Sequence, residues 1–595
     1  MGSTAMKLKL MACGFFFFSM VLFGSAMMND QIDEDKKLAK FFDGMLEDEF
    51  KLRPMVATQL GDHRFDDKLE NPSEKNRELW KQFYKSSLEK LRSQIKLESL
   101  STNGKVDFKV LESNLERTLW LQEFNKTYET DPRAYNELIA DSLYLPLSQS
   151  TIPEEKIVAA LIARVALVPK VLQSAKESIK NPPKVILNTA IKQNLGSIRF
   201  YKKGIAEFVK NPDLKTRLLE ATNKVVPSLE SYQDFLQDLA KKGIDSDWRI
   251  GKEQFKLKLV HELQTGVGAD ELLRLAELEM VTVTHEMYVI ARQLWSGLYP
   301  GMVLPVPDFK GKNETIAKVL EKLSEKRGNP QDLLKDTRST VKKIQSFITA
   351  KNILTLPQPD RCQILEMPEF QRGNSVAYLN QAPPLDTNAS SVYAISPPPS
   401  DWDANTVLSF MKEYNSYMLQ ILTIHEAYPG HYVQLEYSNK HPSKIRRVLS
   451  SGVFAEGWAV YTEKMMLDEG YGDQDPGLRI HQLKWYLRAV ANAVLDYQMH
   501  CNNMTDEQAL DLLVNRAFQT QGEALGKIIR SKQSSCQLST YFAGSVFFNK
   551  LRADAQNAKG EAFNLKQYHE AVLSHGTLPL NLLRDLVWSD LGLGK

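Results

Sequence analysis

The segment His425-Glu426-Ala427-Tyr428-Pro429-Gly430-His431 sets the strongest constraint on how this chain folds. A His-Glu pair followed by a second histidine is typical of helical metal-binding motifs, but there the second histidine comes four residues after the first, and here it comes six after. Successive residues of an α-helix turn by about 100°, so an unbroken helix points these two imidazoles about 120° apart. Proline cannot continue the hydrogen-bond ladder and glycine reaches conformations closed to other residues, so Pro429-Gly430 predicts a break that swings His431 back toward His425.

A second segment with the same spacing, His569 to His575, has no breaker inside it. We expect it to stay helical until Gly576 and to point its histidines apart, so we do not interpret it as a metal site. His261 and His285 have no second histidine nearby and are interpreted as ordinary helix residues.

A third ligand is expected from the segment that begins 25 residues beyond His431, where Glu456 and Glu463 occur. Two imidazoles and one carboxylate are a common ligand set for a catalytic Zn²⁺, which keeps its fourth position open. We favour Glu456 as the ligand. Glu463, seven residues on and on the same helical face, is then its supporting partner or the alternative ligand. Glu426 beside the first histidine is the predicted general base.

The composition excludes one broad class of function. The 595-residue chain carries 75 basic and 73 acidic residues, and it has no basic block of the kind that nucleic-acid binding requires. A hydrophobic content of 43% is ordinary for a soluble globular protein. We therefore expect no nucleic-acid partner.

The N-terminus has the pattern of a signal peptide, predicted over residues 1–26. Lys7 and Lys9 precede an apolar run from Leu10 to Phe23 that is too short to span a membrane comfortably, and small residues follow it. We predict an exported protein, periplasmic or extracellular, without stable membrane insertion after cleavage. Cys13 follows Leu10-Met11-Ala12 as in a lipoprotein box, but most of the apolar run comes after it, which argues against lipidation.

Three cysteines remain after the signal segment: Cys362, Cys501 and Cys536. An odd number leaves at least one free thiol, and we interpret all three as unpaired.

Helical periodicity predicts an N-terminal helical lobe over 27–300 and a C-terminal lobe over 301–595 that carries the metal motif. Long helices are expected at Ile157–Ser178, Leu187–Val209 and Ala269–Leu298. Proline punctuates 300–403, where Val392 to Ile395 is the best strand. We predict that it is an edge strand on which a substrate backbone pairs, with Tyr393 and Ala394 as substrate-binding residues.

His425-Glu426-x-x-Pro429-Gly430-His431 followed by Glu456-Gly457-Trp458-Ala459-x-Tyr461-x-Glu463 resembles the hallmark of the bacterial domain of unknown function 885 family, which is itself similar to the glutamate-liganded zinc peptidases (gluzincins). Segments around Gly61–Asp67, Tyr541–Gly544 and Tyr568–Leu580 extend the resemblance over most of the mature chain. Family members usually carry a second histidine where this chain has Tyr432, and often a proline where it has Cys536. The resemblance implies a mainly α-helical, zincin-like peptidase fold with a deep cleft and a small β element near the active site.

Three further residues are candidates for the chemistry. Tyr541 is similar to a tyrosine of thimet-oligopeptidase-like enzymes and is our first candidate to stabilise an oxyanion; a packed core tyrosine is the alternative. His500, four residues after Asp496, is the second, with a surface ion pair as the alternative. Arg488 is a candidate to bind a substrate carboxylate.

These patterns together predict a zinc-dependent metallopeptidase acting on a peptide substrate. A hydrolase of a non-peptide amide and a non-catalytic binding protein with a peptidase-like fold are the alternatives. The sequence does not distinguish endopeptidase from exopeptidase action, and it leaves the oligomeric state open.

Overall fold

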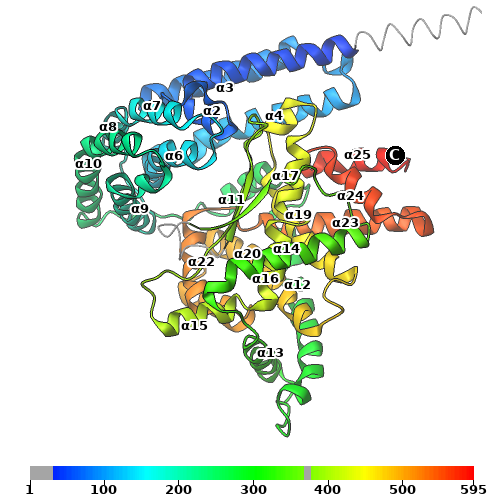
Figure 1. The fold of residues 1–595 in the computed structure, drawn as a ribbon. Helices are drawn as coiled ribbons and strands as arrows, with labels where there is room; N and C mark the ends of the chain where they lie inside the picture. Colours follow the sequence, from blue (N-terminus) through cyan, green and yellow to red (C-terminus); the bar gives the residue numbers. More distant parts are fainter. Residues whose placement is uncertain (1–30, 368–376, 595) are drawn as a thin grey trace, which may run out of the picture.

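The computed structural model describes residues 31–367 and 377–594 of the chain, so the predicted signal segment and Cys13 lie outside the described residues. The fold is mainly helical, with one small three-stranded sheet, as expected (Figure 1). The three cysteines of the described part, Cys362, Cys501 and Cys536, are unpaired, and Cys536 is buried.

The first part of the chain, blue to teal in Figure 1, is a layer of helices. After a helix over residues 31–52 its helices are α2 (Pro54–Leu60), α3 (Glu74–Gln94), α4 (Thr102–Asn125), α5 (Thr127–Thr130), α6 (Arg133–Gln149), α7 (Glu154–Val165), α8 (Val168–Ser178), α9 (Lys184–Lys202) and α10 (Pro212–Lys241).

Two expected helices differ in this layer. The helix predicted over Ile157–Ser178 is divided into α7 and α8, because Pro169 lies in the first turn of α8 and cannot continue the ladder of α7. The second, predicted over Leu187–Val209, starts earlier and ends at Lys202. The stretch Glu154–Ser178 is long and apolar enough to cross a membrane, but 50% of its most apolar window is buried inside the protein.

The second part holds the remaining helices. These are α11 (Lys252–Leu263), α12 (Ala269–Leu298), α13 (Phe309–Leu323), α14 (Leu333–Ala350), α15 (Ala404–Glu413), α16 (Ser416–Glu426), α17 (His431–Asn439), α18 (Lys444–Val448), α19 (Gly452–Asp468), α20 (Pro476–Cys501), α21 (Asp506–Asp511), α22 (Gln521–Gln533), α23 (Thr540–Lys559), α24 (Leu565–Leu573) and α25 (Leu583–Asp590). Helix α12 has the predicted bounds.

Three apolar clusters hold these helices together. The largest extends from Phe255 to Leu591, so α11 and α12 pack with the C-terminal helices although they precede residue 300. The other two belong mostly to residues 38–239, and Ile445, Leu578 and Leu586 join one of them from the C-terminal part. Burial of apolar side chains therefore stabilises the contact between the two parts of the protein as well as the core of each part.

The small sheet corrects the prediction of an edge strand. Strands β1 (Cys362–Glu366), β2 (Ala377–Asn380) and β3 (Ser391–Ile395) lie in the order β1-β3-β2. The strand that was predicted, β3, is central: it is parallel to β1 and antiparallel to β2. Its backbone is already paired on both sides, so Tyr393 and Ala394 have no free edge for a substrate. Alternation of side chains reports burial but not the position of a strand in its sheet.

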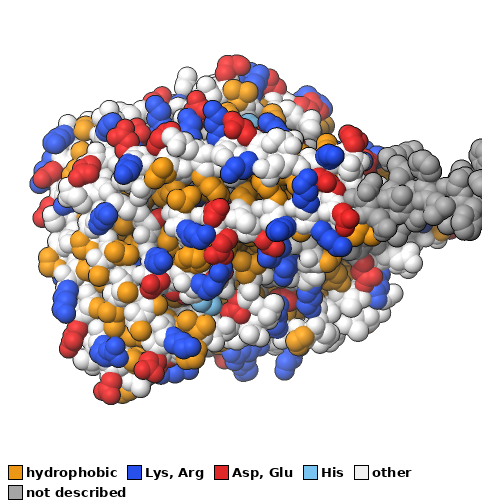
Figure 2. All heavy atoms as spheres, turned by 90° about the horizontal axis from the view of Figure 1, so that it is seen from above, with side chains coloured by type: hydrophobic (Ala, Val, Ile, Leu, Met, Phe, Trp, Pro, Cys, Tyr) orange, Lys and Arg blue, Asp and Glu red, His pale blue; other side chains and the backbone are white. Residues whose placement is uncertain are grey.

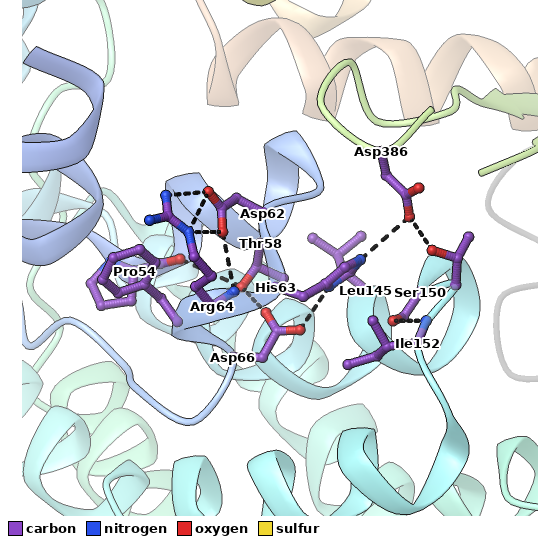
Figure 3. Close-up of polar contacts among 12 residues, drawn as sticks. Pro54, Thr58, Asp62, His63, Arg64, Asp66, Leu145, Ser150, Ile152 and Asp386 are labelled. Atoms are coloured by element: carbon purple, nitrogen blue, oxygen red, sulfur yellow. Dashed lines mark hydrogen bonds and ion pairs between the residues drawn. The ribbon is translucent and has the colours of Figure 1, made fainter. Parts of the chain in front are cut away.

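The motif around Gly61 forms a joint between the two parts (Figure 3). Gly61 has a left-handed φ of 85°, and a Cβ there would collide with Pro383 and Asp386. The backbone N–H of Leu385 donates to the carbonyl of Leu60 at 2.8 Å. This glycine therefore lets the loop before β3 lie directly against the end of α2.

His63 links three segments at this joint (Figure 3). Its Nδ1 lies 2.8 Å from Asp66 Oδ2, and its Nε2 lies 3.4 Å from Asp386 Oδ2. Thr151 donates to the same oxygen of Asp386 at 2.6 Å. The hydrogen bond to Asp66, followed by the charges of both carboxylates, raises the pKa of His63 above its usual value.

We expect the joint to be stabilised by protonated His63. A pKa raised on folding gives stability that is complete below the unfolded pKa of about 6.5 and is lost as the pH rises through the folded value. The loss in melting temperature caused by His63→Ala should therefore be larger at about pH 5.5 than at about pH 8.5, measured by differential scanning fluorimetry. His285→Ala, on an exposed site of α12, is the control. An equal loss at both pH values would show that His63 carries no charge there.

Charged side chains of both signs are mixed on the face seen from above. Figure 2 shows Lys and Arg interspersed with Asp and Glu and with apolar side chains over the N-terminal helices. This arrangement agrees with the balanced composition, and this face has no continuous basic surface for a nucleic acid.

Candidate metal centre

The helix that carries His425 is interrupted before His431. Helix α16 ends at Glu426, α17 begins at His431, and the Tyr428–Pro429 peptide bond between them is cis. Gly430 donates its N–H to the carbonyl of Ile424 at 3.0 Å, so the linker folds back onto the last turn of α16. The sequence predicted this break.

Gly430 is required here for a different reason from the one expected. Its φ is −70°, a value open to other residues. A Cβ at this position would overlap the carbonyl oxygens of His425 and Ile424. Glycine is required at this position because it has no side chain, which lets two backbone segments approach closely. Its extra conformational freedom is not used here.

His425, His431 and Glu456 converge, and their ligand atoms all lie within 4.8 Å of one another. Glu456 Oε2 lies 3.7 Å from His425 Nε2 and 3.5 Å from His431 Nε2. Two ligands bound at about 2.0–2.1 Å and at a tetrahedral angle are about 3.4 Å apart, so these separations suit one Zn²⁺ between them. The two rings are nearly perpendicular, at 87°, so each presents an edge nitrogen to the same space.

Glu463 binds the far side of His425. Its Oε1 lies 2.7 Å from His425 Nδ1, and its side chain is fully buried. Such a carboxylate fixes the tautomer, so Nδ1 carries the proton and Nε2 is free to face the cluster. The geometry places Glu456 at the convergence point and gives Glu463 the role of orienting His425.

One atom of the cluster lacks a partner. Glu456 Oε2 is buried and has no hydrogen-bond partner among the described residues. Burial raises the pKa of Glu456, but His425 and His431 outweigh that effect and hold the pKa well below its usual value. A buried, ionised carboxylate oxygen that faces two imidazole nitrogens is suited to a cation, so the donor set fits zinc.

A close crossing of two helices brings Glu456 to this point. Gly457 on α19 lies directly against Gly544 on α23, and a Cβ on either residue would collide with the backbone of the other helix. Trp458, the next residue, donates its indole N–H to the carbonyl of Pro429 at 2.9 Å. Helix α19 thus holds both the carboxylate and the interrupted linker.

Glu426 contacts the backbone of an outer strand of the sheet. Its Oε2 accepts a hydrogen bond from the backbone N–H of Leu379 at 3.2 Å, and Leu379 belongs to the outer strand β2. Burial raises the pKa of Glu426, and the charges of His425 and His431 oppose that rise. No sequence pattern pointed to Leu379, because a backbone donor can belong to any residue type.

Tyr541 lies at the start of α23, three residues before the crossing at Gly544. Its hydroxyl oxygen accepts from Arg530 Nη2 at 3.2 Å and from Gln537 Nε2 at 3.5 Å, which leaves its own proton available to donate. Burial raises the pKa of Tyr541, so the hydroxyl stays protonated near neutral pH. Among the described residues, Glu456 is close enough for its charge to raise this pKa further.

Two other candidates have different surroundings from those predicted. His500 Nε2 lies 2.9 Å from the carbonyls of Ser531 and Ser534, and its ring stacks on Phe255, so it joins α20 to the end of α22 inside the core. Arg488 is half-buried and forms an ion pair with Glu523. Neither side chain is free to bind a substrate or an oxyanion in this arrangement.

The segment from His569 to His575 keeps its histidines apart as expected, but its helix ends at Leu573 and not at Gly576 as predicted. Helix α24 carries His569 into the core, where its Nε2 lies 2.7 Å from the hydroxyl of Tyr461. His575 instead lies beyond that helix, with its Nε2 3.0 Å from Asp590 Oδ2. The two imidazoles have separate partners and do not share a site.

A cavity of about 390 Å³ opens beside the cluster and is lined by Glu456, Gln537 and Thr540. Residues of α4 and α11 form its opposite wall, including Arg117 and Lys258. A larger hollow of about 800 Å³ lies between α13 and α20 and contains none of the three converging residues. We associate the smaller cavity with the site because it borders Glu456.

The geometry defines a mainly helical protein with a cluster of two histidines and one carboxylate, built around an interrupted helix. The chain belongs to the family described as "Bacterial protein of unknown function (DUF885)", which matches residues 54–587. No curated protein matches it.

Two solved structures are similar over nearly the whole chain. A "putative lipoprotein of unknown function" from Shewanella oneidensis shares 30% identity with a TM-score of 0.79, over 92% of this chain and 99% of that one. A "putative lipoprotein" from Colwellia psychrerythraea shares 19% identity with a TM-score of 0.79, over 94% of this chain and 99% of that one. The second likeness shows the fold alone.

We expect Gly430→Ala to weaken zinc binding, because the new methyl group must displace the carbonyl of His425 and move His431 with it. Zinc affinity, measured by isothermal titration calorimetry after chelation, should fall at least about tenfold. Gly452→Ala, where a Cβ meets nothing within 4 Å, is the matched control. A folded Gly430→Ala protein that binds zinc like the wild type would refute this account of the linker.

Proposed function

We propose that this protein is an exported zinc-dependent metallopeptidase with a zincin-like fold of the gluzincin type. The observation that carries the proposal is the convergence of His425, His431 and Glu456. Glu426, adjacent in sequence to the first of these, accepts a hydrogen bond from the backbone of the outer strand β2. In this proposal the three converging residues hold Zn²⁺, and a peptide is the substrate.

Zinc bound in such a site lowers the pKa of a water from about 15.7 to about 7 and polarises the scissile carbonyl. The protein's own groups supply the proton transfers and the positioning. Glu426 accepts a proton from the attacking water and passes it to the leaving nitrogen; its raised pKa suits both steps. Tyr541 donates its hydroxyl proton to the oxyanion as it develops.

The backbone of the outer strand β2 around Leu379 is the place proposed for the substrate backbone. An extended peptide can add to an exposed sheet edge through main-chain hydrogen bonds. Leu379 already directs its N–H outward to Glu426, so a peptide aligned along β2 has its backbone beside the proposed base. This assignment replaces the role that the sequence suggested for Tyr393 and Ala394.

Export is supported by the pattern of residues 1–26 and by the relatives, since both similar structures are described as putative lipoproteins. Mass spectrometry of the mature N-terminus distinguishes the two routes: cleavage near Met27 gives an unmodified chain, and cleavage before Cys13 gives a lipidated one.

Glu426→Gln tests the proposed chemistry. We expect this variant to bind zinc like the wild type and to lose peptide hydrolysis by about 10²–10⁴-fold, because the amide cannot accept the proton. Activity is measured on a peptide library by mass spectrometry, with zinc content measured on the same samples. Glu286→Gln is the matched control, since it also follows a histidine but is exposed on α12.

Two results would exclude this function. Wild-type turnover by zinc-loaded Glu426→Gln would remove Glu426 from the mechanism. A zinc-loaded wild-type protein that cleaves no peptide in the library would exclude a peptidase and favour a non-peptide substrate or a binding role.

A further inference from the structure

Lys527 is a buried cation without a partner. It lies on α22 and is only 6% exposed. Among residues 31–367 and 377–594 it has no hydrogen bond and no ion pair. Burial, followed by the charges of Arg488 and Arg530, lowers the pKa of Lys527 well below its usual value. The nitrogen itself keeps a small contact with solvent, so a ligand can reach it. A largely buried cation without a counter-ion destabilises a fold, and a bound anion offsets that cost.

The nearest carboxylates are already engaged. Glu523 forms an ion pair with Arg488, and Glu413 lies 2.8 Å from the ammonium of Lys484. Each of these pairs is neutral in itself, so neither carboxylate is left over as a counter-ion for Lys527. Glu456 also acts on Lys527 electrostatically, but its oxygen faces the two histidines of the metal cluster.

Arg530 adds a second uncompensated cation, one turn from Lys527 on the same face of α22. It forms no ion pair within the described part of the chain, and its Nη2 donates to Gln537 Oε1 at 2.8 Å and to the Tyr541 hydroxyl at 3.2 Å. Arg530 is exposed, so solvent and ligands reach this end of the helix. Arg530 therefore lies beside Tyr541, the proposed oxyanion donor, and Lys527 lies one turn away on the same helix.

Helix α22 lies where the two parts of the protein meet. It packs against α20 of the C-terminal part and α9 of the N-terminal part (Figure 1). Gln533 at its end accepts from Arg133 at 2.9 Å and donates to the carbonyl of Val185 at 3.2 Å. Contacts with α20 on one side and with α9 on the other thus fix the orientation of α22 and of the basic residues on it.

We propose that Lys527 and Arg530 bind a carboxylate of the substrate next to the scissile amide. A carboxylate accepts two parallel hydrogen bonds from a guanidinium and a further charged one from an ammonium, so one anion satisfies both residues. This deepens the proposed function and rests on it: the substrates are peptides or N-acyl amino acids with a carboxylate close to the cleaved bond. That carboxylate belongs either to the C-terminus or to an acidic side chain.

Binding is measured on full-length mature, zinc-loaded Glu426→Gln protein by isothermal titration calorimetry, so that no probe is consumed. Three probes separate the sources: N-acetyl-alanyl-alanine, its C-terminal amide, and N-acetyl-alanyl-glutamic acid α-amide, which carries only a side-chain carboxylate. We expect one of the two carboxylates to bind at least about tenfold more tightly than the neutral amide.

Lys527→Met in the same background should remove that preference, because the thioether keeps the shape but not the charge. We expect the carboxylate probe to lose at least about tenfold in affinity and the neutral amide to change little. Lys532→Met is the matched control: it lies on the same helix, and its ammonium is already paired with Asp506 at 2.6 Å. It should bind all three probes like its parent.

Stability gives an independent readout. Replacing a buried, unpaired cation by an apolar side chain should leave the melting temperature unchanged or raise it, which a structural ion-pair role would not do. The proposal is overturned if Lys527→Met keeps the carboxylate preference, or if the parent protein binds all three probes equally. Peptide hydrolysis that depends on Glu426 would then still stand, so the failure of this inference is distinguishable from that of the proposed function.

Discussion

The site depends on one close contact, between the backbone of Gly430 and the last turn of α16. The N–H of Gly430 reaches the carbonyl of Ile424 six residues earlier, and only a residue without a Cβ leaves room for that approach. Because of this contact the chain reverses between His425 and His431 and starts a new helix at the second histidine. A continuous helix would place the two imidazoles on different faces.

A second contact of the same kind brings in the carboxylate. Gly457 and Gly544 let α19 and α23 cross with their backbones touching, which places Glu456 opposite the histidines and Tyr541 nearby. Trp458 ties this crossing to the linker through the carbonyl of Pro429. Two glycine contacts and one indole hydrogen bond thus fix the positions of residues far apart in the sequence. Such rigid support is what a site needs if its ligands are to be held ready for an ion.

The charged residues around the cluster fall into two groups, one acidic and one basic. Both histidines face the half-buried carboxylate of Glu456, and His425 also binds the fully buried carboxylate of Glu463. On the side of α22, Lys527 and Arg530 are cations without acidic partners in the described part of the chain. An imbalance of this kind reduces stability, and proteins commonly retain it where a ligand supplies the missing charge.

The sequence by itself determined the helical class of the fold, the break at Pro429-Gly430 and the rejection of the second His-x5-His segment, since these follow from local periodicity and from the chemistry of proline and glycine. It also singled out Glu456 as the third ligand, from the ligand set that zinc requires, and Tyr541 through a resemblance to known enzymes. Only the tertiary structure decided that β3 is central, that Glu463 orients His425, and that Arg488 and His500 are occupied elsewhere. Only the tertiary structure showed that Lys527 is largely buried without an acidic partner in the described part of the chain. The order of strands in a sheet, the hydrogen-bond partners of a site residue and the lack of a counter-ion all depend on which distant segments of the chain pack together. A local pattern in a single sequence does not contain this information.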